Sequence, residues 1–160
     1  MNIEDKVGIA ELIERGGIFP DINGTTPQEV LSAFVRAIPS IPSVSGENLL
    51  KAVLEREALM STSIGKGIAL PHPRNPLITS DADQFVALAF LKNRVEWNTL
   101  DGIPVDTLLL IISASARQHL HVLSRLNFFC QQEDFYRLLK NRAPREELLR
   151  FIRETEKNWE

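Results

Sequence analysis

Two continuous apolar runs constrain the fold of this chain most strongly. The first is "QFVALAFL" at residues 84–91, and the second is "VDTLLLIIS" at residues 105–113. Apolar runs without alternating polar residues are typical of strands that are buried on both faces. The segment between them carries Asp101 and Gly102, a pair that favours a turn. A sheet built from such strands requires apolar cover on both of its sides.

Helices are predicted to supply that cover. Thr26 is placed as the N-cap of a helix over residues 27–38, with Pro27 at its first position. A second helix is expected to begin near Ser45 and to carry a stripe of Leu49, Val53, Arg56 and Met60. Short strands are predicted at residues 18–22 and 67–71, and helices at 116–132, 133–141 and 144–157. The pattern predicts an α/β fold, a central sheet with helices on both faces, in a single domain over residues 1–160.

Composition excludes several classes of protein. The net charge of −3 and the pI of about 5.7 give no basic footprint for nucleic acid. Cys130 is the only cysteine, so no disulfide forms within the chain, which agrees with a reducing, cytoplasmic location. The N-terminal stretch has no sustained apolar region and does not resemble a signal peptide. The run from Thr107 to Ile112 falls far short of the ~18 residues of a membrane helix, so no direct membrane insertion is expected.

A histidine between two prolines is the first candidate for chemistry. Pro71 and Pro73 restrict the backbone before and at His72, which follows the predicted strand at 67–71. The sequence permits two interpretations, namely a turn that contains a histidine and a nucleophile or ligand presented on a stiff loop. A second histidine favours the functional interpretation.

That second histidine is His119. Ser115 and Gln118 have the spacing of a capping box, so a helix is expected to begin there with His119 in its first turn. His119 shares an apolar stripe with Val122, Leu123, Leu126 and Phe129 and should point toward the sheet, whereas His121 lies about 200° further around the helix. On pattern alone, the preferred interpretation of His119 is a core histidine with a satisfied hydrogen bond. If the two preceding strands run in the same direction, the rings of His72 and His119 converge at one edge of the sheet.

Phosphoryl transfer onto histidine is the chemistry that fits this pair best. Neither a zinc-ligand spacing, a G-x-S-x-G elbow nor a complete P-loop is present, so no metal and no cofactor is predicted. A neutral imidazole is a good nucleophile near neutral pH, and a helix N-terminus and cations stabilise its anionic product. Arg56 is either an inward cation, a snorkelling side chain or a carbonyl ligand. Arg74 is either a phosphate ligand or an exposed charge.

The stretch "LEREALMSTSIGKGIALPHPRNPL" resembles the active-site segment of the fructose/mannitol-type IIA proteins of the bacterial phosphotransferase system, closest to the nitrogen-regulatory branch. "LDGIPVDTLLLI" and "RQHLHVLSRL" are similar to later segments of that family, and the likeness runs from about residue 25 to residue 155, with a weaker N-terminal portion. The resemblance implies a mixed sheet sandwiched by helices. It also implies that His72 is phosphorylated, that His119 supports it, and that Arg56, Ser61 and Thr62 flank the phosphate.

The resemblance implies partners as well. A histidine phosphocarrier protein (HPr-like) would donate the phosphoryl group, and a IIB protein or a regulatory target would receive it. Regulation is favoured because no IIB, IIC or membrane segment is fused in this sequence; sugar uptake through a IIB partner and a binding module that is never phosphorylated are the alternatives. The chain departs from the family at Pro73 and Arg74, where relatives carry Gly or Gly-Lys. Pro73 removes a backbone donor, and Arg74 retains a cation.

Overall fold

A mixed sheet of five strands organises residues 7–159, the part of the chain that this computed structural model describes. Its strand order is β1-β4-β5-β3-β2. The strands are β1 (Ile18–Ile22), β2 (Ser63–Gly65), β3 (Ile68–Ala69), β4 (Phe85–Val95) and β5 (Val105–Ile112). β1 is parallel to β4 and β3 is parallel to β5, whereas β4 is antiparallel to β5 and β2 is antiparallel to β3. The predicted mixed α/β architecture is confirmed.

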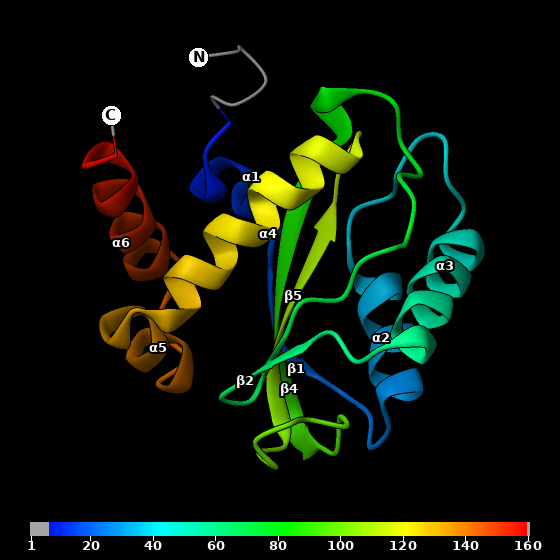
Figure 1. The fold of residues 1–160 in the computed structure, drawn as a ribbon, viewed down its shortest axis with the longest axis horizontal. Coiled ribbons are helices and arrows are strands. Elements are labelled where there is room, and N and C mark those ends of the chain that lie inside the picture. Colours follow the sequence, from blue (N-terminus) through cyan, green and yellow to red (C-terminus); the bar gives the residue numbers. More distant parts are fainter. Residues whose placement is uncertain (1–6, 160) are drawn as a thin grey trace.

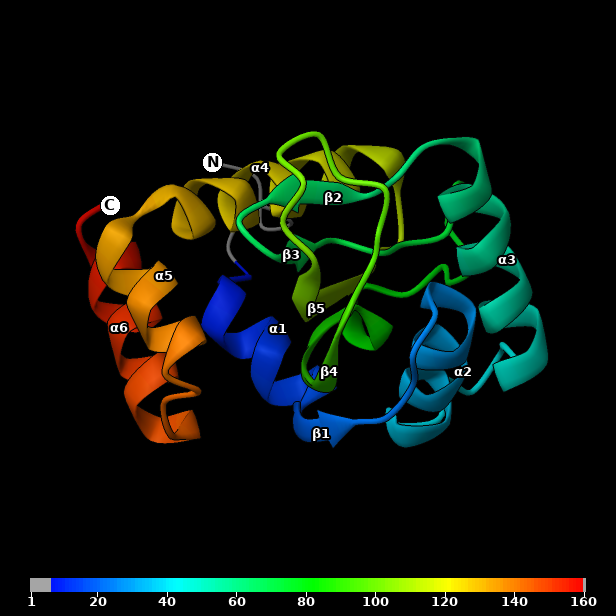
Figure 2. The ribbon, with the colours of Figure 1, turned by 90° about the horizontal axis from the view of Figure 1, so that it is seen from below.

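Helices cover both faces of this sheet, as Figures 1 and 2 show. The helices are α1 (Ile9–Gly16), α2 (Pro27–Ala37), α3 (Gly46–Leu59), α4 (Ala116–Gln131), α5 (Glu133–Lys140) and α6 (Arg145–Lys157), with a short 3-10 helix η2 (Asp81–Asp83). α2 and α3 lie on one side, and α1, α4, α5 and α6 lie on the other. The central sheet therefore separates two apolar cores.

The alternation of side chains along β4 and β5 explains why residues 85–91 and 108–112 of these strands include no polar position. Ala87 and Ala89 of β4 face the core beneath α2 and α3, whereas Val86 and Leu88 face the core beneath α1 and α4. All four side chains are almost completely buried. Because both faces are covered, both sets of alternating residues must be apolar.

Local capping signals set the predicted helix starts. The Thr26 hydroxyl accepts a hydrogen bond from the Glu29 amide at 3.2 Å, and Pro27 occupies the first position of α2. The Ser45 hydroxyl caps α3 through the Asn48 amide at 3.1 Å. The predicted stripe of α3 was wrong at Met60. The helix ends at Leu59, and Met60 is extended and 71% exposed.

Helix α1, strand β2 and helix η2 were not predicted. Gly8, the N-cap of α1, has no side chain that could cap the helix. The Glu156 carboxylate instead accepts hydrogen bonds from the amides of Ile9 and Ala10 at 2.9 and 3.2 Å. Residues 1–6, which belong to the stretch that argued against a signal peptide, and residue 160 lie outside the described residues. The single domain over residues 1–160 stays a prediction. Over residues 7–159, no helix is long and apolar enough to cross a membrane.

Candidate active site

The parallel pairing of β3 with β5 brings the two candidate histidines together. Ile68 is in register with Thr107, and the pairing continues past β3 because the Ile111 amide donates to the Pro71 carbonyl at 3.0 Å. His72 directly follows Pro71, and His119 lies in the first turn of the helix that follows β5. Their ring centroids are 4.4 Å apart, with the planes inclined at 44°. The predicted convergence is confirmed.

The environment of His72 defines its tautomer. Its side chain is buried, and Nδ1 lies 2.8 Å from the carbonyl oxygen of Leu70. A carbonyl oxygen only accepts hydrogen bonds, so Nδ1 carries the proton. Burial lowers the pKa of His72, although the Leu70 carbonyl and the Glu57 carboxylate raise it in part and Arg56 lowers it further. Near neutral pH the ring is therefore uncharged, with a free lone pair on Nε2.

His119 is held neutral more strongly than His72. Burial is the main cause that lowers its pKa from the usual 6.5 to about 4. The protonated form of His72 and the guanidinium of Arg56 act in the same direction. The hydroxyl of Ser115 accepts the Gln118 amide at 3.2 Å, so α4 starts as the capping pattern predicted. A neutral ring at this position offers one N–H donor and one acceptor to a group bound beside His72.

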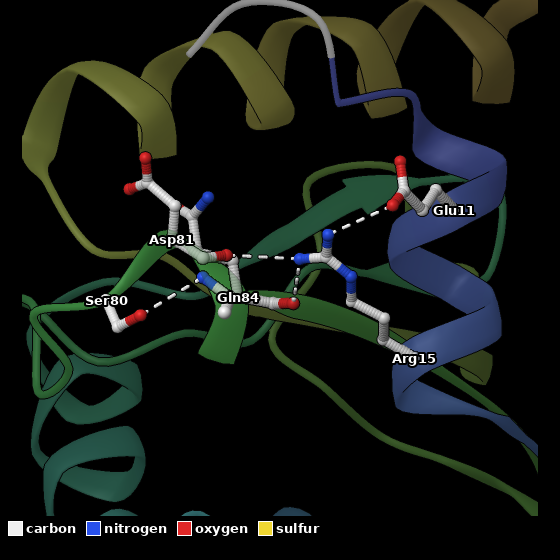
Figure 3. A network of polar contacts seen from close by, with 6 residues as sticks. Glu11, Arg15, Ser80, Asp81 and Gln84 are labelled. Carbon is white, nitrogen blue, oxygen red and sulfur yellow. Dashed lines mark hydrogen bonds and ion pairs between the residues drawn. The ribbon is translucent and has the colours of Figure 1, made fainter. Parts of the chain in front are cut away.

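A network of hydrogen bonds around η2 anchors the start of α4, and Figure 3 shows the part of it that joins η2 to Arg15 of α1. Arg15 of α1 donates to the carbonyls of Asp81 and Gln84 at 3.1 and 3.2 Å. The Asp81 carboxylate accepts from the side-chain amide of Gln118 at 3.1 Å, and the Gln84 side chain accepts from the Ala114 amide at 2.9 Å. These bonds fix the turn that leads from β5 into the helix carrying His119. Sequence patterns contain no signal for them, because the partners are more than 29 residues apart.

Two arginines flank the histidine pair in different ways. Arg56 donates to the carbonyl of Met60 at 2.7 Å, so of the three interpretations of this residue the structure shows the carbonyl ligand. Its positive charge also lowers the pKa of both histidine rings. Arg74 is exposed. A cavity of about 220 Å³ lies beside His119 and is lined by Pro73, Arg74, Asn75, Pro76, Ile111, Ser113, Ala116, His119 and Leu120. The cavity thus has room for an anion beside His119, with Arg74 at its wall, and it begins at Pro73, the residue after the buried His72.

The two predicted hydroxyl residues are engaged within the protein. Ser61 donates to the carbonyl of Trp97 at 3.0 Å, and Thr62 donates to the Glu57 carboxylate at 2.6 Å. A phosphate-binding role for Ser61 and Thr62 stays a prediction. Glu57 itself was missed by the sequence analysis, although it directly follows Arg56.

Comparison with known proteins yields one consistent family. The profile described as "Phosphoenolpyruvate-dependent sugar phosphotransferase system, EIIA 2" matches residues 11–155, so the likeness starts earlier than the predicted residue 25. The nitrogen regulatory protein of Escherichia coli strain K12 is 30% identical over 131 residues, which cover 80% of this chain and 77% of that protein. The fructose-specific EIIABC component of Bacillus subtilis strain 168 is 26% identical over 152 residues.

That match covers 93% of this chain but spans only 24% of the Bacillus protein. Among solved structures, nitrogen regulatory protein IIA-Ntr from Neisseria meningitidis superposes with a TM-score of 0.75 at 23% identity, over 90% of this chain and 98% of that one. This last likeness is one of fold.

Proposed function

The chain belongs to the EIIA type 2 family of the phosphoenolpyruvate-dependent sugar phosphotransferase system, and from this premise we propose that it carries a phosphoryl group on Nε2 of His72. The observation that supports this assignment most directly is the 2.8 Å contact from Nδ1 to the Leu70 carbonyl. Because that contact occupies the Nδ1 proton, Nε2 is the nitrogen with the free lone pair. The ring of His119, 4.4 Å away between centroids, connects this nitrogen's surroundings to the cavity that His119 and Arg74 line.

The proposed step balances without any proton leaving the ring. The Nε2 lone pair of His72 attacks the phosphorus of a phosphohistidine on a histidine phosphocarrier protein in the cytoplasm. The phosphorus–nitrogen bond of the donor breaks, and its electron pair returns to the donor's imidazole. The Nδ1 proton stays on the Leu70 carbonyl, so the phosphorylated ring carries a positive charge beside a dianionic group.

Neighbouring groups would stabilise the phosphoryl oxygens in that product. Neutral His119 has one N–H to donate, and Arg56 and Arg74 supply cations. Arg56 would exchange its hydrogen bond to the Met60 carbonyl for the phosphate. Ser61 would contribute a hydroxyl donor once it releases the Trp97 carbonyl, whereas Thr62 would flank the phosphate while its hydroxyl stays on Glu57. Pro73 offers no amide at a position where relatives have one, and the guanidinium of Arg74 takes that place in this proposal.

The acceptor is proposed to be a regulatory protein target. The relative that supports this is the nitrogen regulatory protein of Escherichia coli, which this chain matches over most of both lengths. A phosphate on His72 would then change a protein interface by charge. The second candidate is transfer to a IIB partner in sugar uptake, and the likeness to a fructose-specific EIIABC component favours it.

Intact-mass measurement after incubation with a phosphorylated histidine phosphocarrier protein tests this proposal. The wild-type chain should gain the mass of one phosphoryl group, and the His72→Ala variant should gain none. His119→Ala should still gain this mass, because the acceptor nitrogen of His72 is present. It should do so more slowly, because the supporting N–H of His119 is lost. A wild-type chain that remains unmodified would leave the binding module as the surviving interpretation, and a His72→Ala variant that is still modified would assign the acceptor elsewhere.

A further inference from the structure

The Glu57 carboxylate sits at the centre of a set of hydrogen bonds beside the proposed acceptor. Its Oε1 accepts from the Thr62 amide at 2.9 Å and from the Trp97 indole at 2.6 Å. Its Oε2 accepts from the Thr62 hydroxyl at 2.6 Å. One side chain of α3 therefore ties together the segment that enters β2 and the loop between β4 and β5. Three donors on one carboxylate also fix the position of the negative charge.

Backbone hydrogen bonds connect this carboxylate to His72. The Thr62 carbonyl accepts from the Leu70 amide at 3.0 Å, and the Leu70 carbonyl accepts from Nδ1 of His72 at 2.8 Å. Thr62 is thus held on one side by Glu57 and on the other by Leu70. Any displacement of Thr62 would move the carbonyl that orients the His72 ring.

Glu57 also opposes its neighbour Arg56 electrostatically. Two charged groups of α3 act on His72, and His119 faces it from α4. Arg56 lowers the pKa of His72, and Glu57 raises it. The positive charge that the ring acquires on phosphorylation needs an anion near the ring, whereas the phosphoryl group needs a cation. Arg56 and Glu57 are adjacent in sequence and have the charges for these two tasks.

We infer that Glu57 is a positioning residue for the phosphoryl transfer proposed above: it holds Thr62, Leu70 and the His72 ring in line, and its charge offsets the positive charge of the phosphorylated ring. This inference rests on the proposed function for its role in transfer. The coupling between Glu57 and the ring of His72 does not depend on it.

Glu57→Gln separates charge from geometry. A glutamine side chain has the same length, its carbonyl oxygen can accept from the Thr62 amide and the Trp97 indole, and its NH₂ group can donate to the Thr62 hydroxyl. The matched control is Glu55→Gln, which makes the same charge change at an exposed position of α3. NMR titration of the His72 ring should show a lowered pKa in Glu57→Gln, because the carboxylate that raises it is gone, and the initial phosphorylation rate should fall roughly three- to tenfold. Glu55→Gln should match the wild type in both.

Thr62→Val tests the positioning part, since it keeps the charge of Glu57 and removes one of its hydrogen bonds. The pKa of His72 should then stay near the wild-type value while transfer slows. A Glu57→Gln variant with unchanged pKa and rate, or a Thr62→Val variant with an unchanged rate, overturns the inference. If the wild-type chain accepts no phosphoryl group, the proposed function fails, and the His72 titration still decides whether Glu57 is coupled to the ring.

Discussion

The structure predicts that acid lowers the free energy of unfolding through protonation of His119, and the pKa of this ring gives the size of the effect. The pKa of this ring is about 4 in the folded protein against an ordinary value of 6.5. Between these two values the unfolded chain binds a proton that the folded chain does not bind. The free energy of unfolding therefore falls as the pH drops below 6.5, and the loss is complete below about 4. Above 6.5 the ring makes no contribution of this kind.

The size of the effect follows from the same two values. Near pH 5, linkage with a folded pKa of about 4 and an unfolded pKa of 6.5 gives a loss of about 2 kcal/mol. His119 is partly accessible to solvent, which screens the interaction, so about 1 kcal/mol is the expected value. Replacing His119 by glutamine removes the titration and leaves the contributions of the other groups in place.

Urea unfolding of the wild type and of His119→Gln, near pH 7 and near pH 5, measures this difference. The wild type should lose about 1 kcal/mol more than the variant between the two conditions. NMR titration of the His119 ring gives the folded pKa independently. Parallel losses in the two proteins, or a ring that titrates near its ordinary value, would show that burial beside His72 does not hold His119 neutral.

Three further changes test other parts of the site and its support. Arg56→Gln should raise the pKa of both His72 and His119, because its positive charge lowers both, and ring titrations that do not move would contradict the placement of that charge. Ser115→Ala removes the cap of α4 and should lower the free energy of unfolding by about 1 kcal/mol in urea, whereas no change would mean that Asp81 and its partners suffice to hold the helix start. Leu126→Ala, at a fully buried position of α4, should cost roughly 2–5 kcal/mol by the same measurement, and a cost near zero would contradict its place in the core.

The fold was predictable where local patterns and burial coincide. The apolar runs of β4 and β5 required cover on both faces, and Thr26, Ser45 and Ser115 marked helix starts through hydrogen bonds to amides three residues away. Helix α1 was not predicted because the carboxylate that caps its N-terminus belongs to Glu156, at the other end of the chain. Long-range caps leave no signal in the local sequence.

Of the site, the proximity of the two histidine rings was predictable from the sequence. His72 and His119 each follow an apolar strand, and the parallel direction of β3 and β5 converts that sequence position into proximity. Glu57 could not be identified in the same way, since its partners lie 5 and 40 residues away and become neighbours only when α3, β2 and the loop after β4 meet. Met60 was misplaced because the helical period was extended one residue past the helix end.

The two prolines around His72 restrict the loop that follows β3, yet this segment keeps its hydrogen bond to β5. A proline lacks an amide hydrogen but keeps its carbonyl, and the Pro71 carbonyl accepts from Ile111 of β5. On the other side, Leu70 uses its amide toward Thr62 and its carbonyl toward the ring of His72. The hydrogen bonds next to His72 therefore use the carbonyl of Pro71 and the amide and carbonyl of Leu70, and none of them requires an amide hydrogen from a proline. The prolines restrict the backbone on both sides of His72 while the hydrogen bonds that orient the ring remain intact, so substitutions at Pro71 should act on the geometry of Nε2 and not on the chemistry of the imidazole.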